Sequence, residues 1–146
     1  MITKIKNLIL LGIAVLFTGS LAAHDHKKTE KPDRSPKNIG SVLVFGGTGW
    51  YRHPETAAIS GWLARLSDEL GMQVDVSDSP KDISQLLDNY DVLILNNSNE
   101  LVKLFDEKQR KKIEDWYNAG GGIVALHAAI VRQTEWEWLT TLAGCD

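Results

Sequence analysis

The sequence has little cysteine, no basic cluster and only one long apolar segment, and each shortage excludes a class of protein. The single cysteine cannot form an internal disulfide, so no disulfide bond staples this fold. Lysine and arginine number 16 against 19 acidic residues, and the formal net charge is −3. No segment is basic enough to indicate nucleic-acid binding. We therefore expect no nucleic-acid partner.

The one long apolar segment lies near the amino terminus, from Leu8 to Phe17, and follows two lysines. It is too short to remain comfortably as a permanent membrane anchor. Ser20 and Ala22 are small residues at positions that a signal peptidase reads. The pattern predicts a signal peptide over residues 1–23, preferably cleaved after Ala22. We expect export to a periplasmic or extracellular compartment, with no membrane attachment after cleavage.

A polar segment follows, because residues 24–38 contain no large apolar side chain. This composition predicts a disordered, solvated linker, in which His24 and His26 are exposed rather than metal-binding. Ordered structure is expected over residues 39–146.

Four short segments of this ordered part have the composition of β-strands. Three are continuous apolar runs, as in strands covered on both faces, and one alternates apolar with polar residues, as at a sheet edge. The apolar runs are 41–46, 91–95 and 122–126, and the alternating segment is 72–76. Helical spacing follows each strand, up to Leu70, over 82–89, over 106–119 and over 134–143. This order predicts an α/β fold with a flavodoxin-like, three-layer parallel sheet in the strand order 2-1-3-4.

Two consequences concern apolar surfaces. Segment 122–126 would form an uncovered apolar edge, which predicts self-association or completion by a partner. Helical spacing also places Trp62 on one apolar face of the first helix, with other apolar residues. In the last helix we expect Trp136 to pack in the core, whereas Trp138 either packs or stacks on a sugar ring.

The loop after the first strand contains several residues suited to chemistry. Ligands gather at the carboxyl ends of parallel strands. Gly47 permits close approach of a ligand, although the loop lacks both the P-loop motif and the third glycine of a dinucleotide site. Arg52 suits an anionic or hydroxyl-rich ligand, and His53 a general base or metal ligand. The alternative is that Arg52 pairs with a surface acid and His53 caps the helix.

Two further loops follow apolar strands. Asn96, Asn97 and Ser98 donate and accept hydrogen bonds as sugar hydroxyls require, although a plain polar turn fits equally well. His127 follows the last strand and has small neighbours, as a strand-to-helix elbow requires. Two histidines at two strand ends predict that His53 and His127 face one cavity.

Four segments together resemble a known family. They are VLVFGGTGWYRHPE, NYDVLIL, FDEKQRKKIEDWYNAGGGIVALHAA and EWEWLTTLAG. The chain from residue 41 to 146 resembles the amino-terminal part of a ThuA-like (trehalose utilisation) domain. That family is similar in fold to the class I glutamine amidotransferases. Its members continue further, so the resemblance implies a truncated domain over 39–146.

The resemblance also implies a site and an activity. The family's Arg-His pair corresponds to Arg52 and His53, and its Gly-Gly-Gly…His-Ala-Ala block to residues 120–129, which include His127. The amidotransferases carry a nucleophilic cysteine near this elbow, so glutaminase activity is not expected. The family is associated with disaccharide and keto-sugar metabolism, and some members bind a divalent metal, for which His53 and His127 would be the ligands here.

We therefore expect an exported domain that binds a carbohydrate and acts as an isomerase or lyase. His53 or His127 would move a proton next to a carbonyl, with Arg52 or a metal as electrophile. The candidate substrate-binding residues are Gly47, Tyr51, Asn96, Asn97, Ser98 and Trp138. The alternatives are a non-catalytic carbohydrate-binding module and an inactive truncated fragment.

Overall fold

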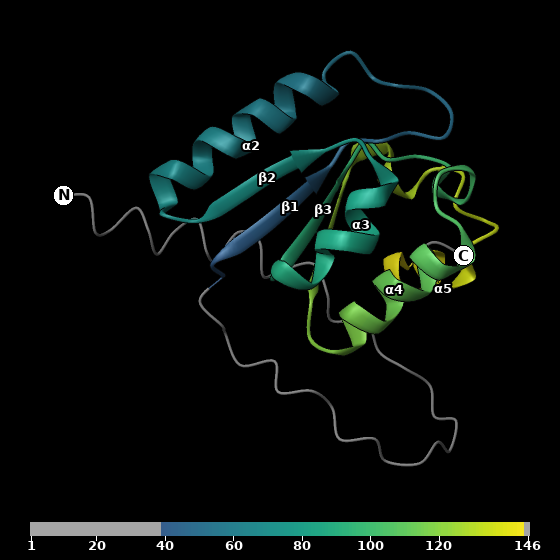
Figure 1. Cartoon of the computed structure of the whole chain (residues 1–146). Coiled ribbons are helices and arrows are strands. Elements are labelled where there is room, and N and C mark those ends of the chain that lie inside the picture. The colour runs from purple at the N-terminus through teal and green to yellow at the C-terminus, as the bar shows by residue number, and fades with distance from the viewer. Residues whose placement is uncertain (1–38, 145–146) are drawn as a thin grey trace. The chain divides into compact units, whose positions relative to one another are not determined.

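The structure is a computed structural model that describes residues 39–144 (Figure 1). The predicted signal peptide over 1–23 and the predicted linker over 24–38 lie outside the described residues. Within 39–144, no helix has the length and apolar character needed to cross a membrane.

Four parallel strands form one sheet, in the order β2-β1-β3-β4. The strands are β1 (Ser41–Phe45), β2 (Gln73–Ser77), β3 (Val92–Asn96) and β4 (Gly122–Leu126). In the register, Val44 lies beside Val76 on one side and Ile94 on the other, and Ile94 lies beside Val124. The predicted fold class and strand order are confirmed, and the strand ends differ from the prediction by at most one residue.

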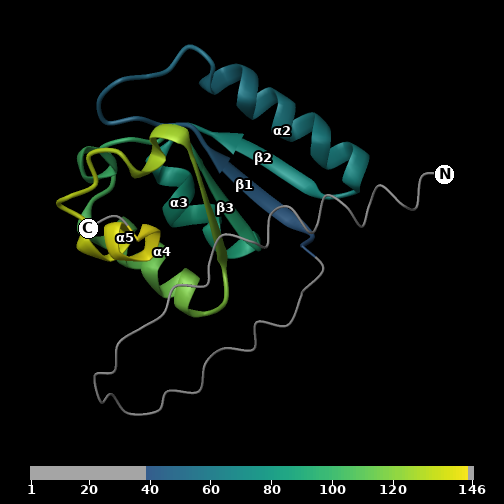
Figure 2. The same ribbon diagram turned by 180° about the vertical axis from the view of Figure 1, so that it is seen from behind.

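Helices cover both faces of this sheet. Helix α2 lies on one face, and α3, α4 and α5 lie on the other (Figures 1 and 2). The helices are α2 (Thr56–Leu70), α3 (Pro80–Leu86), α4 (Glu107–Asn118) and α5 (Glu137–Ala143). Short 3₁₀ turns are η1 (Leu87–Asn89), η2 (Leu101–Lys103) and η3 (His127–Ile130). Helix α4 begins at the predicted capping box, in which the Asp106 side chain accepts from the Gln109 amide and the Gln109 side chain accepts from the Asp106 amide.

The main apolar core lies between the sheet and helices α3, α4 and α5. Its strand members are Leu43, Phe45, Leu93 and Leu95, its helix members include Ile83, Ile113, Trp116 and Leu139, and Trp136 joins them from the turn before α5. Each large apolar side chain buried there contributes about 1.5–3 kcal/mol relative to exposure. This side of the sheet therefore anchors the strands whose carboxyl ends carry the polar loops.

Helix α2 differs from the prediction in the face that it buries. Trp62 is 54% exposed, whereas Thr56, Ser60 and Ser67 are buried. A Cβ atom added to Gly46 would lie 3.2 Å from Thr56 Cγ2, so helix and loop approach closely there. Only small side chains fit this contact, and apolar spacing alone does not reveal it.

Helix α5 begins three residues later than predicted. Trp136 precedes the helix with φ −126° and ψ 74°, outside the helical region. Its ring is buried, as predicted, and its Nε1 donates to Glu114 Oε1 at 2.9 Å. Core packing and the hydrogen bond to α4 thus hold the indole in place, and α5 begins at the next residue, Glu137.

Candidate functional site

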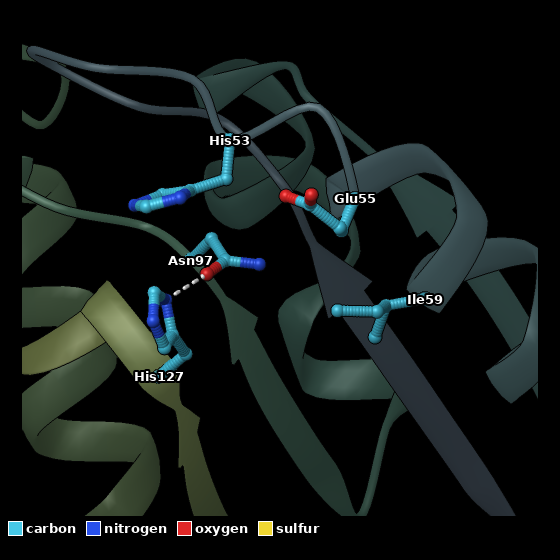
Figure 3. A pocket seen from close by; sticks show the side chains of 5 residues that line it. All are labelled: His53, Glu55, Ile59, Asn97 and His127. Carbon is cyan, nitrogen blue, oxygen red and sulfur yellow. Dashed lines mark hydrogen bonds between the residues drawn. The ribbon is translucent and has the colours of Figure 1, made fainter.

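Three loops at the carboxyl ends of β1, β3 and β4 surround a hollow of about 410 Å³ (Figure 3). We call it the histidine hollow. It is lined by His53, Glu55, Ile59, Asn97 and His127. His53 follows β1, Asn97 follows β3 and His127 follows β4. Strand β3 lies between β1 and β4 in the sheet. Asn97 therefore follows the middle one of these three strands, and each histidine follows one of the other two.

The two imidazoles lie against each other at this hollow. Their ring centroids are 4.7 Å apart and the ring planes are nearly perpendicular, at 88°. The Tyr51 ring makes a similar edge contact with His53, at 4.8 Å. The structure thus brings His53 and His127 to one hollow, as the strand-end argument expects. Their chemical roles stay a prediction.

The His127 ring is fixed by an unusual backbone. His127 has φ 52° and Asn97 has φ 58°, so both non-glycine residues are left-handed. His127 Nδ1 lies 2.7 Å from Asn97 Oδ1. Left-handed backbone costs about 1–3 kcal/mol per residue and persists where the surroundings enforce it, often at functional sites. Here the two strained residues are joined directly by their side chains.

The side chains of Asn96 and Ser98 form hydrogen bonds within the protein. Both are completely buried. Asn96 Nδ2 donates to the Thr56 carbonyl oxygen and to Ser60 Oγ, each at 2.9 Å, and Ser98 Oγ donates to the Phe45 carbonyl oxygen at 2.8 Å. Neither residue lines the histidine hollow. Of the three polar residues predicted to bind substrate here, the structure therefore places only Asn97 at the hollow.

Arg52 is engaged by a neighbouring loop. Its guanidinium pairs with Asp78 at 2.8 Å and donates to the Gly46 carbonyl oxygen at 3.2 Å. Both charged side chains are about half exposed. This is the pairing with a surface acid that the sequence left open as the alternative. A Cβ atom on Gly47 would lie 2.5 Å from the Phe45 ring, so packing alone requires glycine there.

Trp138 lies elsewhere. Its ring stacks on Trp136 with centroids 5.8 Å apart and meets Tyr117 edge-on at 5.6 Å. It lines a separate shallow hollow, together with Glu137, Thr141 and Leu142. The structure does not bring Trp138 together with the two histidines.

Asn99, which the sequence pattern did not single out, holds the loop that carries His53. Asn99 Nδ2 donates to the Tyr51 carbonyl oxygen at 2.7 Å, and Asn99 Oδ1 accepts from the Trp50 amide at 3.2 Å. The Asn99 carbonyl oxygen also accepts from the Gly49 amide at 2.9 Å. These three bonds pin the loop that carries His53. Only the run of amides after β3 hinted at such a role.

A second contact holds the same loop from the side. The Arg132 guanidinium lies 4.8 Å from the centroid of the Trp50 ring and also pairs with Glu100. A hydrogen bond from Lys103, with a further one from Arg132, lowers the pKa of Glu100 against the opposing effect of burial. Glu100 is therefore held as a carboxylate, which keeps Arg132 against Trp50.

Glu55 was also missed. It stands directly after Pro54 and just before α2, which places its carboxylate beside Asn97 at the hollow (Figure 3). Its position between His53 and the start of α2, at the carboxyl end of β1, is the signal that would have identified it.

The fit of a divalent metal can be tested on the residues present. Within residues 39–144, no three His, Cys, Asp or Glu side chains are grouped so as to hold a metal ion. The hollow offers two imidazoles set edge to face, whereas a protein zinc site has at least three protein ligands. The described residues thus do not form a complete metal site, and we derive no step through a metal.

Fold and hollow together define an α/β protein with its candidate site at the carboxyl ends of parallel strands. Over residues 41–146 the sequence matches the model of the ThuA family, described as trehalose utilisation, and the chain belongs to that family.

One solved structure supports the same fold. It is a ThuA-like protein from Bacteroides uniformis ATCC 8492, with a TM-score of 0.60 and 20% sequence identity. The match covers 84% of this chain and 48% of that one, so the chain spans about half the length of that protein. No curated protein is similar enough to this sequence to count as a match.

Proposed function

We propose that the histidine hollow binds a carbohydrate and that the protein moves a proton next to the carbonyl of a keto-sugar or keto-disaccharide. The observation that carries the proposal is the pair of imidazoles, 4.7 Å apart, at the ends of β1 and β4. Membership of a family linked to trehalose utilisation supports a sugar as the ligand. The volume, about 410 Å³, is within the range of small-molecule sites.

The chemistry follows from two imidazoles on one ligand. One imidazole takes the proton from the carbon next to the carbonyl, the electron pair of that C–H bond forms a carbon–carbon double bond, and the carbonyl π pair moves to the oxygen. The other imidazole donates a hydrogen bond to the oxygen as it becomes negative. Isomerisation is completed when the proton returns to the former carbonyl carbon and the neighbouring hydroxyl gives its proton to the former carbonyl oxygen. A lyase reaction follows instead when the oxyanion collapses back to the carbonyl and a leaving group departs, with its bonding electron pair, from the next carbon. Glu55 is placed to accept hydrogen bonds from sugar hydroxyls.

We also propose that the protein acts outside the cytoplasm, on the strength of the signal-peptide pattern in residues 1–23. Amino-terminal sequencing of the protein from the producing cells tests this. A first residue of Ala23 or His24 supports export, and an intact Met1 in the membrane fraction contradicts it.

The test of the activity is hydrogen exchange in heavy water. The purified protein is incubated with a keto-disaccharide, and deuterium at the carbon next to the carbonyl is followed by NMR. We expect enzyme-dependent exchange that falls about 10²–10⁴-fold in His127→Gln and in His53→Gln, the size of a general acid–base contribution. His26→Gln, a histidine that the sequence places in the linker, is the matched control and should exchange normally.

Binding without exchange would favour the alternative, a carbohydrate-binding module. The absence of both binding and exchange, across keto-disaccharides and their parent sugars, would contradict the proposal.

A further inference from the structure

The contact between Asn97 and His127 is the end of a buried chain of hydrogen bonds that starts at the backbone. Asn96 Nδ2 donates to the Thr56 carbonyl oxygen and to Ser60 Oγ, each at 2.9 Å. Asn97 Nδ2 donates to Asn96 Oδ1 at 3.0 Å, and Asn97 Oδ1 lies 2.7 Å from His127 Nδ1. The two asparagines are 0% and 1% exposed, so water does not compete for these groups.

The direction of every bond in this chain follows from its first member. A backbone carbonyl oxygen can only accept, so the Asn96 atom next to Thr56 must be the amide nitrogen. Asn96 Oδ1 then faces Asn97 and can only accept, so Asn97 must present Nδ2 to Asn96 and Oδ1 to His127. Turning either amide over would set two acceptors against each other in a buried place, which costs about 1–3 kcal/mol.

The same logic reaches the imidazole. Asn97 Oδ1 is an acceptor, and an unprotonated Nδ1 at 2.7 Å would be a second acceptor facing it. Nδ1 therefore carries the hydrogen, and Nε2 carries the lone pair in the neutral ring. Within residues 39–144 no hydrogen bond involves His127 Nε2, so that atom is open to a ligand.

We infer that the Asn96–Asn97 pair sets the tautomer of His127, with the hydrogen on Nδ1 and the basic lone pair on Nε2. Asn96 and Asn97 are positioning residues that act through His127. Asn97 lines the hollow, but both of its polar side-chain atoms are engaged in the chain.

For the reaction, this inference rests on the proposed function, and it selects between the two histidines. His127 Nε2 is the atom that takes the proton, and His53 is left as the group that faces the carbonyl oxygen. The ligand must therefore present an acidic C–H bond to His127.

The test reads the tautomer directly and needs no substrate. The full-length protein is labelled with ¹⁵N at histidine and measured by long-range ¹H–¹⁵N correlation at alkaline pH, where histidine is neutral. His127→Gln identifies the His127 signals. We expect one pattern, with a pyrrole-like Nδ1 and a pyridine-like Nε2. An Nε2–H tautomer, or a mixture of the two, would overturn the inference.

Three variants distinguish the hydrogen-bond chain through Asn96 from a contact between Asn97 and His127 alone. Asn97→Gly keeps a left-handed backbone without strain and removes the acceptor, so the single-tautomer pattern should be lost. Asn96→Leu leaves Asn97 in place but frees its amide to turn, so a mixture is expected there too. Asn97→Asp offers only acceptors, so adding it to Asn96→Leu should restore the Nδ1–H pattern. A merely structural role for Asn96 does not predict that rescue.

The matched control is Asn118→Gly, which removes an exposed asparagine at the end of α4 and should leave the His127 tautomer unchanged. If Asn96→Leu does not fold, the comparison of Asn97→Gly with Asn97→Asp still decides. The inference is supported if Asn97→Gly loses the single Nδ1–H tautomer and Asn97→Asp retains it. It is overturned if both variants show the same tautomer pattern. A protein with the Nδ1–H tautomer but no exchange on keto-sugars would refute the proposed function and leave this inference standing.

Discussion

The smallest unit that matters for the site is the buried asparagine at the end of β3. All of the Asn96 side-chain hydrogen-bonding atoms have partners, and two of these partners, Thr56 and Ser60, belong to α2. The small, polar inner face of α2 is thus explained by the asparagine that it must satisfy. Helix, sheet and hollow are coupled through one amide group.

A pair of substitutions in α2 tests whether the polar face of this helix is there to bind Asn96. Thr56 is completely buried and its Oγ1 has no hydrogen-bond partner among the described residues. Thr56→Val removes this hydroxyl and should raise the free energy of unfolding by about 1 kcal/mol. Ser60→Ala removes an acceptor of Asn96 and should lower it by about 1 kcal/mol. Urea unfolding measures both, and equal effects of the same sign would contradict the assignment.

A second residue-scale prediction concerns alkaline pH. Tyr90 donates from its hydroxyl to Asp75 Oδ2 at 2.7 Å. Burial, then the hydrogen bond to Asp75 and its charge, raise the pKa of Tyr90 to about 12 from 10.0. The folded-state pKa lies above the unfolded one, so this stabilisation is complete below pH 10 and is lost as pH rises through 12.

The loss amounts to about 2–3 kcal/mol. Urea unfolding at about pH 9 and about pH 12 should show a smaller difference for Tyr90→Phe than for the unchanged protein. Asp75→Asn should fall between them, because burial still acts on Tyr90. An identical alkaline loss in all three proteins would show that Tyr90 does not carry it.

At the scale of secondary-structure elements, the loop that carries His53 is held by close backbone contact. A Cβ atom on Gly49 would lie 2.1 Å from the Glu100 carbonyl oxygen. Gly61, in the interior of α2, has nothing within 4 Å of such an atom. Substitution by alanine is therefore crowded at Gly49 and unhindered at Gly61.

Gly49→Ala should lower the free energy of unfolding by about 1–3 kcal/mol, because the loop must move away from Glu100. Gly61→Ala should raise it by about 0.5–1 kcal/mol, since alanine is the better helix former. Thermal unfolding by circular dichroism compares them. A neutral Gly49→Ala would mean that the loop is not held in this position.

Much of this architecture is predictable because parallel strands have a strong signature. Continuous apolar runs locate β1, β3 and β4, and the alternation in β2 identifies an edge. Strand order then places residues after β1, β3 and β4 at one end of the sheet, which is why His53 and His127 converge. Apolar spacing does not predict the exposed Trp62, because the inner face of α2 is set by contacts with Gly46 and Asn96.

The roles of neighbouring polar residues were harder to predict. Asn96 and Asn97 are adjacent and identical, yet one is buried against α2 and the other lines the hollow. The difference arises from the left-handed backbone at Asn97, which redirects the chain after one residue. The run of polar residues predicts a turn, but it does not show which of the two adjacent asparagines takes the left-handed backbone. The pairing of Arg52 with Asp78 likewise depends on how the loops after β1 and β2 meet.

At the scale of the whole molecule, β4 is an edge strand of the sheet that residues 39–144 form. It pairs with β3 on one side, and the Ala125 side chain within it is exposed. An apolar edge of this kind is a template for pairing with another chain. We therefore propose that the protein self-associates through residues 122–126.

Sedimentation velocity over a range of concentrations tests this proposal. Ala125→Lys places a charge on the edge strand and should shift the protein towards monomer. Ala57→Lys makes the same change on an exposed position of α2 and should leave association as it was. A protein that is monomeric at every concentration, or an equal effect of both variants, would contradict self-association through β4.

The most direct test of the central claim, that the histidine hollow is the ligand site, is an NMR titration of side-chain nitrogen signals. The purified protein is titrated with a keto-disaccharide while the imidazole and indole signals are followed together. We expect the signals of His53 and His127 to shift together and saturate, while those of His26 and Trp138 stay in place. A saturating shift of Trp138 with stationary His53 and His127, or no shift at either place, would contradict it.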